Sequence, residues 1–346
     1  MHSFENAALE QMALHKIGCK LAEEGIRAST QPVNLNDDVT TLLLNYFLLP
    51  FKKEEYYNFF DERSLDYNLV YKCVTEIFEN PETLFEQSVA LAKHLYEKGE
   101  HPKVKNGEFY VAYFENCEID DEVVSAVGLF KSEHKDHFLK IYTNGQDFEM
   151  QGDTGIPIGK LDKGCLIFNI QKEDGYVVCV QDGSKNSEGG YWIDAFLQLR
   201  ERADDFYFTQ NMMTVCKEFV TKQLPEEFEI TKVDQADLLN KSAHFFKEND
   251  DFDIENYIET VLPDETAARS FKSFKKGFEA EHDLKISDQF EVSEPAVKKQ
   301  SKIFKSVIKL DKNFHIYVHG NRELIEKAYD ETSKLHYYKL MYQYEE

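Results

Sequence analysis

The basic side chains that could bind phosphate are concentrated in one stretch of an otherwise acidic chain. The 346 residues carry a formal net charge of −24. Residues 269–312, however, hold 11 Lys and Arg against 7 Asp and Glu, a net charge of +4. We call this stretch the basic island. Because each cation that neutralises a phosphate releases counterions, clustered lysines of this kind favour binding to a nucleic-acid backbone.

Helical periodicity predicts how the first part of the basic island is arranged. In a helix over residues 264–280, successive side chains are rotated by about 100°. The apolar residues of this helix then share an arc of about 60°; they are Ala267, Phe271, Phe274 and Phe278. The basic residues fall on a separate arc about 120° wide; they are Arg269, Lys272, Lys275 and Lys276. We therefore expect the phenylalanines to pack on the core and the four cations to point outward together.

A second group of lysines follows Ser293. In a helix beginning there, Lys298, Lys302 and Lys305 share a face, with Lys299 beside them. If residues 303–310 form a strand instead, Lys305 and Lys309 share one face of it. The predicted DNA-binding residues are Arg269, Lys272, Lys275, Lys276, Lys298, Lys299, Lys302, Lys305 and Lys309.

The residue types of this set predict contacts with phosphate rather than with bases. Lysine is a point charge, whereas base-specific contacts favour Arg, Asn or Gln, so we expect little sequence preference. The alternative is that these lysines are solvated or pair with the chain's own carboxylates, among them Glu279, Glu281 and Asp283.

Other residue patterns point only weakly to chemistry. His134 and His137 have a spacing that could bind a metal, but surface or structural histidines are the favoured interpretation.

Residues 152–155 contain the Asp-Thr-Gly triplet of aspartic proteases around Asp153, and a second triplet could come only from a homodimer. We therefore favour a turn between strands for residues 152–155, with an enzyme built on Asp153 or the histidines as a weaker hypothesis. We predict no catalytic residue, no metal site and no cofactor.

Composition limits the class of protein. No apolar run approaches the ~20 residues that span a bilayer, so no membrane association is expected. The first residues lack a basic segment followed by an apolar one, which predicts no signal peptide. The 6 cysteines are scattered without a CxxC pair, which favours reduced, buried thiols in a cytoplasmic protein. The single tryptophan, Trp192, is expected to be a buried anchor rather than a stacking platform.

The expected elements define an α+β fold with an antiparallel sheet. Short turns join strand-like segments, which favours antiparallel pairing; the segments are residues 9–18, 26–30, 108–119, 122–131, 137–143, 165–171 and 176–181. Helices are predicted around residues 39–47 and from Asn80 to Gly99. A helical region from residue 204, with a first helix ended by Pro225, leads to a mixed C-terminal part. That part has a short helix after Ser293, a hairpin around residues 311–313, a helix from Arg322 and a strand from Leu335. We predict domains over residues 1–203 and 204–346.

Short motifs along most of the chain resemble those of bacterial nucleoid-associated proteins of the NdpA/YejK type. In order, they are residues 13–18, 109–113, 127–130, 191–194, Phe219, Phe304 and residues 314–320. The resemblance implies a cytoplasmic, nucleoid-associated protein that binds DNA without catalysis, and it assigns no DNA-contacting residues.

Two functional hypotheses follow. The first is a non-enzymatic protein that binds double-stranded DNA, or alternatively RNA, through sequence-independent phosphate contacts. The second is an acidic adaptor that joins the nucleoid through a protein partner, such as a basic nucleoid protein. A homodimer is compatible with either hypothesis.

Overall fold

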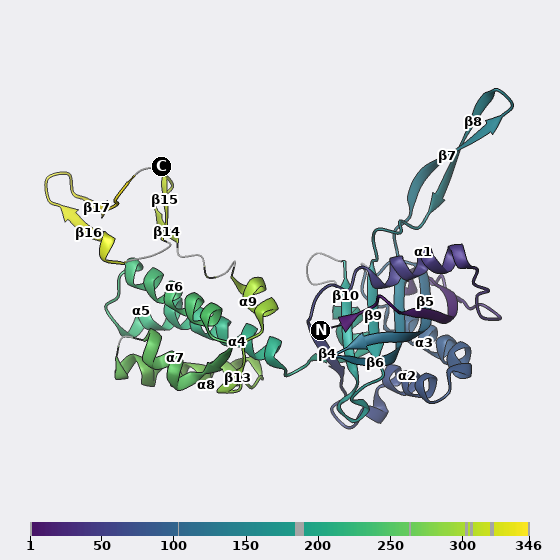
Figure 1. Ribbon diagram of the computed structural model, residues 1–346, viewed down its shortest axis with the longest axis horizontal. Helices are drawn as coiled ribbons and strands as arrows, with labels where there is room; N and C mark the ends of the chain where they lie inside the picture. Colours follow the sequence, from purple (N-terminus) through teal and green to yellow (C-terminus); the bar gives the residue numbers. More distant parts are fainter. Residues whose placement is uncertain are drawn as a thin grey trace. The chain divides into compact units, whose positions relative to one another are not determined.

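The structure is a computed structural model that describes residues 2–102, 104–183, 190–262, 264–301, 304, 307–318 and 322–344. The chain divides into two compact units, Met1–Arg202 and Ala203–Glu346. Figure 1 shows the first unit built around a sheet and the second built mainly from helices. The two units are described separately below.

A single antiparallel sheet forms the centre of the first unit, as the sequence predicts. Its strand order is β11-β4-β10-β9-β6-β5-β2-β3, and β1 also pairs with β5. The strands are β1 (His2–Ser3), β2 (Ala8–Ile17), β3 (Ile26–Arg27), β4 (Tyr56–Phe59), β5 (Gly107–Ile119), β6 (Glu122–Ser132), β9 (Lys163–Phe168), β10 (Val177–Asp182) and β11 (Leu199–Glu201). The predicted α+β class is therefore confirmed, whereas the short strand β4 was not predicted.

Helices bury both faces of this sheet. Successive strand residues point to opposite faces, so Val111 packs in one core while Tyr110 and Ala112 pack in another. The first core lies under α2 (Leu69–Glu79) and α3 (Leu84–Lys98). The second lies under α1 (Asp37–Leu48), where the ring of Phe47 stacks on that of Phe130 at 4.1 Å. Burial on both faces explains why β9 has no exposed residue.

Local signals correctly predicted several elements of the first unit. Asn36 caps α1 by accepting a hydrogen bond from the Val39 N–H at 2.9 Å. Asn80 caps the turn that leads into α3, which ends at Gly99 as expected. Trp192 is fully buried in a helical segment over Tyr191–Leu197, which confirms the anchor interpretation. The helix α2 was missed.

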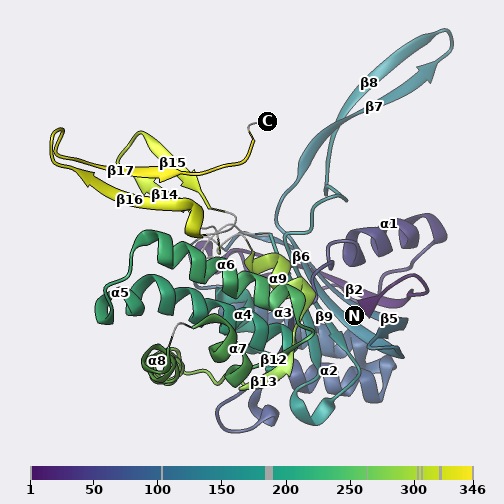
Figure 2. The same ribbon diagram turned by 60° about the vertical axis from the view of Figure 1, so that its left-hand side comes forward.

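A two-stranded ribbon projects from the first unit (Figures 1 and 2). It consists of β7 (Asp136–Asn144) and β8 (Asp147–Gly155), which pair only with each other. The turn predicted for residues 152–155 is wrong, because these residues form the last part of β8. Asp153 pairs with Lys140 across the ribbon, so its carboxylate has a structural partner.

Helices α4 to α9 enclose the core of the second unit. They are α4 (Asp205–Glu218), α5 (Leu224–Glu227), α6 (Lys232–Glu248), α7 (Ile254–Val261), α8 (Glu265–His282) and α9 (Glu294–Gln300), with a small ladder of β12 (Asp251–Asp253) and β13 (Gln289–Glu291). The predicted stop at Pro225 is wrong, because wide helical turns over Phe219–Gln223 continue into α5. Pro225 lies in the first turn of α5, where no N–H group is required.

Two hairpins form the C-terminal part. The predicted hairpin around residues 311–313 is confirmed as β14 (Val307–Leu310) and β15 (Phe314–Tyr317). The predicted helix from Arg322 is wrong: a short turn over Arg322–Leu324 leads into β16 (Ile325–Asp330), which pairs with β17 (Leu335–Leu340). Strand pairing overrides helical spacing here, because every residue of β16 has a cross-strand partner in β17, from Ile325 opposite Leu340 to Asp330 opposite Leu335.

The cysteines are unpaired thiols. Cys73, Cys117, Cys165, Cys179 and Cys216 are buried, and Cys19 is partly exposed. Burial raises the pKa of the Cys73 thiol to about 11, which makes it a poor nucleophile near neutral pH. Among the described helices, none combines the length and apolar character that a bilayer span requires.

Candidate nucleic-acid interface

Helix α8 carries the first group of predicted DNA-binding residues. Asp264 caps the helix by accepting hydrogen bonds from the N–H groups of Thr266 (2.8 Å) and Ala267 (2.9 Å). Phe271 and Phe278 are buried in the helical core. The predicted apolar stripe is therefore confirmed, and it fixes which side of α8 faces solvent.

Three of the four basic residues lie on the solvent side of α8. Arg269 and Lys276 are exposed, and Lys272 is partly exposed and forms an ion pair with Glu255 of α7. These three residues fall within about 60° around the helix. We call Arg269, Lys272 and Lys276 the α8 basic face.

Lys275 does not belong to the α8 basic face, so the prediction that all four cations point outward is wrong. Only 6% of Lys275 is exposed. Its Nζ donates to the Ile286 carbonyl at 2.8 Å and pairs with Glu279 at 3.0 Å and Asp288 at 2.8 Å. The reason is angular: Lys275 is four residues after Phe271 and three before Phe278, so it lies at the edge of the apolar stripe. The chain after α8 then covers it.

A groove runs along α8 beside the α8 basic face. It has a volume of about 940 Å³ and is bordered by α8 and by residues 218–227. Its lining includes Arg269 and Lys222, but also four carboxylates, which are Glu218, Glu226, Glu227 and Glu281. Hydrogen bonds from Ser270 and Gln223 hold the pKa of Glu227 below its usual value. The groove itself therefore repels phosphate, so a phosphate contact made by α8 would have to use the exposed side of the helix.

Helix α9 carries part of the second group. Ser293 caps it and Ala296 and Val297 face the core, as the predicted short helix requires. Lys298 is exposed and pairs with Glu294 at 2.7 Å, and this hydrogen bond lowers the pKa of Glu294. The Lys299 ammonium lies 5.2 Å from the centre of the Phe206 ring. Lys302 and Lys305 lie outside the described residues.

Lys309 lies on a strand rather than on a helix, in β14 opposite His315. It is exposed and lines a pocket of about 320 Å³ together with Lys232 and Thr221. Lys232 begins α6, and its Nζ donates to the side-chain amide oxygen Oε1 of Gln235 at 2.9 Å. No sequence signal points to Lys232, because it lies 37 residues before the basic island and comes near Lys309 only through the fold.

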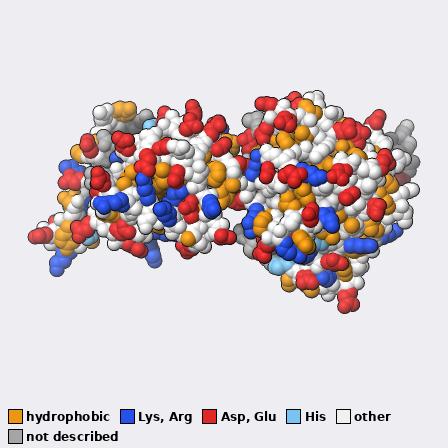
Figure 3. All heavy atoms as spheres, turned by 90° about the horizontal axis from the view of Figure 1, so that it is seen from below, with side chains coloured by type: hydrophobic (Ala, Val, Ile, Leu, Met, Phe, Trp, Pro, Cys, Tyr) orange, Lys and Arg blue, Asp and Glu red, His pale blue; other side chains and the backbone are white. Residues whose placement is uncertain are grey.

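The described basic residues do not form one continuous positive surface. Helices α8 and α9 both pack against α4, which lies between them in both ribbon views (Figures 1 and 2). On the face of the second unit seen in Figure 3, basic and acidic side chains are interspersed. The structure therefore separates the α8 basic face from Lys298 and Lys299.

The family model described as nucleoid-associated protein YejK, NA37, matches residues 14–335. The chain belongs to this family. The match covers both units, and it supports a nucleoid-associated role. None of the curated proteins compared with the sequence matches it.

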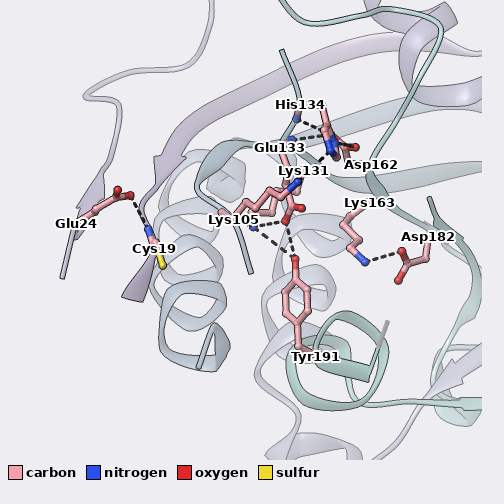
Figure 4. Close-up of polar contacts among 10 residues, drawn as sticks. All are labelled: Cys19, Glu24, Lys105, Lys131, Glu133, His134, Asp162, Lys163, Asp182 and Tyr191. Atoms are coloured by element: carbon pink, nitrogen blue, oxygen red, sulfur yellow. Dashed lines mark hydrogen bonds and ion pairs between the residues drawn. The ribbon is translucent and has the colours of Figure 1, made fainter. Parts of the chain in front are cut away.

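The first unit of this NA37 chain contains a buried polar cluster that the sequence did not predict (Figure 4). Lys131 of β6 and Lys163 of β9 are cross-strand partners, and both are buried. Lys131 donates to Glu133 at 2.6 Å and to the Lys105 carbonyl at 2.7 Å, while Lys163 pairs with Asp182. Burial lowers the pKa of Lys131, and the adjacent Glu133 carboxylate opposes that shift.

Tyr191 and Asp162 complete the cluster. The Tyr191 hydroxyl donates to Glu133 at 3.0 Å, and burial raises its pKa. Asp162 accepts from the N–H groups of Glu133 at 2.7 Å and His134 at 3.0 Å, and it also pairs with the His134 ring. These contacts fix the segment that leads from β6 into the β7–β8 ribbon. The cluster is therefore structural, because its ionic groups are engaged with one another.

The two histidines selected as a candidate metal pair are held separately. His134 contacts Asp162, whereas the His137 ring contacts the Thr154 hydroxyl at 2.9 Å. Within the described part of the chain, no group of three or more His, Cys, Asp or Glu side chains has the geometry of a metal site.

Proposed function

We propose that this NA37 protein binds double-stranded DNA directly and without catalysis, through phosphate contacts made by exposed basic residues of its second unit. The observation that carries the proposal is the α8 basic face, where Arg269, Lys272 and Lys276 project from a helix anchored by its phenylalanines. Lys298, Lys299 and Lys309 would add contacts at separate points, and Lys302 and Lys305 stay predictions.

The charge balance predicts weak binding that is sensitive to salt. Exposed ion pairs such as Lys272–Glu255 contribute little, about 0.2–1 kcal/mol, so a phosphate can compete for the lysine. The carboxylates released in this way still repel DNA, and the whole chain carries −24. The few cations on α8 would therefore attract DNA phosphates only locally, while the negative charge of the rest of the chain repels the DNA.

The test is DNA binding over a salt series. Fluorescence anisotropy with a labelled duplex would compare the wild type with the variant Lys272→Gln/Lys276→Gln. Two lost phosphate contacts should lower the slope of log K against log salt by about 1.8, at about 0.9 per contact. A matched control, Lys72→Gln/Lys93→Gln, removes two exposed lysines from the first unit and should leave the slope unchanged.

Two outcomes would reject this assignment. Equal affinity and slope for the wild type and Lys272→Gln/Lys276→Gln would exclude the α8 basic face. An equal loss in the Lys72→Gln/Lys93→Gln control would show that only net charge matters. Competition with unlabelled RNA distinguishes DNA from the alternative nucleic acid.

A second candidate function is an acidic adaptor that joins the nucleoid through a basic protein. The groove beside α8 supports it, since Glu218, Glu226, Glu227 and Glu281 line it together. In a pull-down with nuclease added, the adaptor hypothesis expects a retained basic protein that Glu226→Gln/Glu281→Gln loses. The matched control Glu82→Gln/Glu86→Gln, on exposed residues of the first unit, should keep it. Loss of every partner after nuclease treatment would reject the adaptor.

A further inference from the structure

One face of the β7–β8 ribbon has no Asp, Glu, Lys or Arg side chain. The register sets Leu139 opposite Gly152, Ile141 opposite Met150 and Thr143 opposite Phe148. Side chains of these pairs point to the same face because partners in a ladder share a face. The four large members of this face are strongly exposed: Leu139 by 69%, Ile141 by 65%, Met150 by 73% and Phe148 by 76%. We call these four residues the ribbon apolar face.

The other face of the ribbon is charged. The alternate residues of the two strands lie there, and they include Asp136, Lys140, Asp147, Glu149 and Asp153. Lys140 pairs with Asp153 on this face. The ribbon is therefore amphipathic in the way that a strand pair with one face against a partner is amphipathic.

A ribbon of this kind is poorly stable by itself. An isolated two-stranded hairpin is marginal in water, and a third strand or a packed surface is usually needed. Contiguous exposed apolar surface in a soluble chain marks an interaction site. The root of the ribbon is well ordered, since Asp162 binds the backbone of Glu133 and His134. The base of the ribbon is held in place while its apolar face is exposed to solvent. Together these features indicate that the ribbon binds a partner through its apolar face.

We propose that the ribbon apolar face packs against the same face of a second copy of this chain. Two molecules that each carry −24 repel one another over most of their surface. Two copies can approach each other through surfaces that carry no charged side chains, because repulsion is weakest there. The ribbon apolar face is such a surface on each copy. Contact between identical patches is the isologous arrangement that most homodimers use.

The shape of the face fits a two-fold pairing. Phe148 is the bulkiest member, and Gly152, four residues along β8, leaves a hollow beside Leu139. A Cβ added at Gly152 would meet no atom within 4 Å. With the two-fold axis at the Ile141–Met150 pair, Phe148 of each copy lies over Gly152 of the other. The Ile141–Met150 pair is then the centre of the contact.

The size of the face sets the expected affinity. A standard stable interface buries about 800 Å² on each partner. Four large side chains with their neighbours are at or below that size, so the dimer should dissociate on dilution. The measurement is therefore sedimentation velocity of the full chain over a concentration series, with a monomer–dimer equilibrium expected for the wild type.

Three variants test the contact. Ile141→Thr/Met150→Thr removes the central pair while keeping residues that suit a strand, and it should give a monomer throughout the series. Gly152→Val fills the hollow without a clash inside one copy, and it should weaken the dimer at least several-fold. Tyr142→Thr/Glu149→Thr changes a cross-strand pair on the opposite face, and it should dimerise like the wild type.

Unchanged circular dichroism and Trp192 fluorescence would show that the variants keep the fold. A wild type that is monomeric up to its solubility limit would overturn the proposal, even if the ribbon then binds DNA or another protein. A dimer that persists in Ile141→Thr/Met150→Thr would overturn it equally. If a variant loses the ribbon itself, cysteine cross-linking decides: Met150→Cys, at the two-fold axis, should give an intermolecular disulfide under mild oxidation, and Gln151→Cys, on the opposite face, should not. The reverse pattern would refute the pairing.

Discussion

The structure predicts that two neighbouring lysines of α8 have opposite roles, and this can be tested by replacing each with alanine. Lys275 is buried and holds Glu279, Asp288 and the Ile286 carbonyl. Lys276 is exposed. Lys275→Ala should therefore destabilise the second unit, whereas Lys276→Ala should weaken DNA binding and leave stability nearly unchanged.

The size of the first effect follows from the contacts that are lost. Removing one member of a buried ion pair costs about 3–5 kcal/mol, because the partner stays buried without its counter-charge. Here Glu279 is mostly buried, but Asp288 is largely exposed and regains water. The Ile286 carbonyl also loses a charged donor, which costs about 1–3 kcal/mol. Because Asp288 regains water and the other two terms overlap, we expect a loss at the lower end of the first range, about 3 kcal/mol in the free energy of unfolding.

The assay must distinguish the two units. Trp192 is the only tryptophan and lies in the first unit, so its fluorescence during urea unfolding reports that unit. Far-UV circular dichroism reports helices of both units, including α4 to α9. Lys275→Ala should shift a circular-dichroism transition to lower urea while the Trp192 transition stays in place. Equal transitions for Lys275→Ala and Lys276→Ala would refute the burial of Lys275.

Two further predictions concern the polar cluster of the first unit. Lys131→Met should lower the free energy of unfolding by about 3–5 kcal/mol, because Glu133 stays buried without its cation; an unchanged Trp192 urea transition would contradict this. Burial acts to raise the pKa of Asp162, but hydrogen bonds from Glu133 and His134 outweigh it and hold the pKa below its usual value. Asp162 therefore stabilises the fold fully at pH values above its unfolded-state pKa of about 3.9. This stabilisation is lost as the pH falls through the lower pKa that Asp162 has in the folded state. Hydrogen exchange at the Glu133 and His134 amides should be slow near neutral pH and faster in Asp162→Asn, and equal rates would count against the predicted role.

Much of the fold could be predicted because its signals are local. Asn36 and Asp264 cap helices through hydrogen bonds to residues two or three positions away. The phenylalanine stripe of α8 follows from helical spacing alone, and the antiparallel sheet follows from short turns between alternating segments. The errors at Pro225 and Arg322 also have a physical cause, since a proline is tolerated in a first helical turn and strand pairing can override helical spacing.

The candidate interface was only partly predictable. Sequence placed Lys275 on the charged arc, but whether it faces solvent depends on the chain at Ile286 and Asp288 folding back over it. Likewise, helical periodicity cannot tell that α4 separates α8 from α9, since each helix was considered alone.

By itself, the sequence determined the charge segregation, the residues that suit phosphate contact and the apolar alternation of each element, because these depend on residue type and spacing. Only the tertiary structure decided which cations are exposed, that Lys131 and Lys163 meet across β6 and β9, and that the ribbon presents one uncharged face to solvent. Those outcomes depend on strand register and on contacts between residues distant in sequence, where a shift of one residue moves every side chain to the other face.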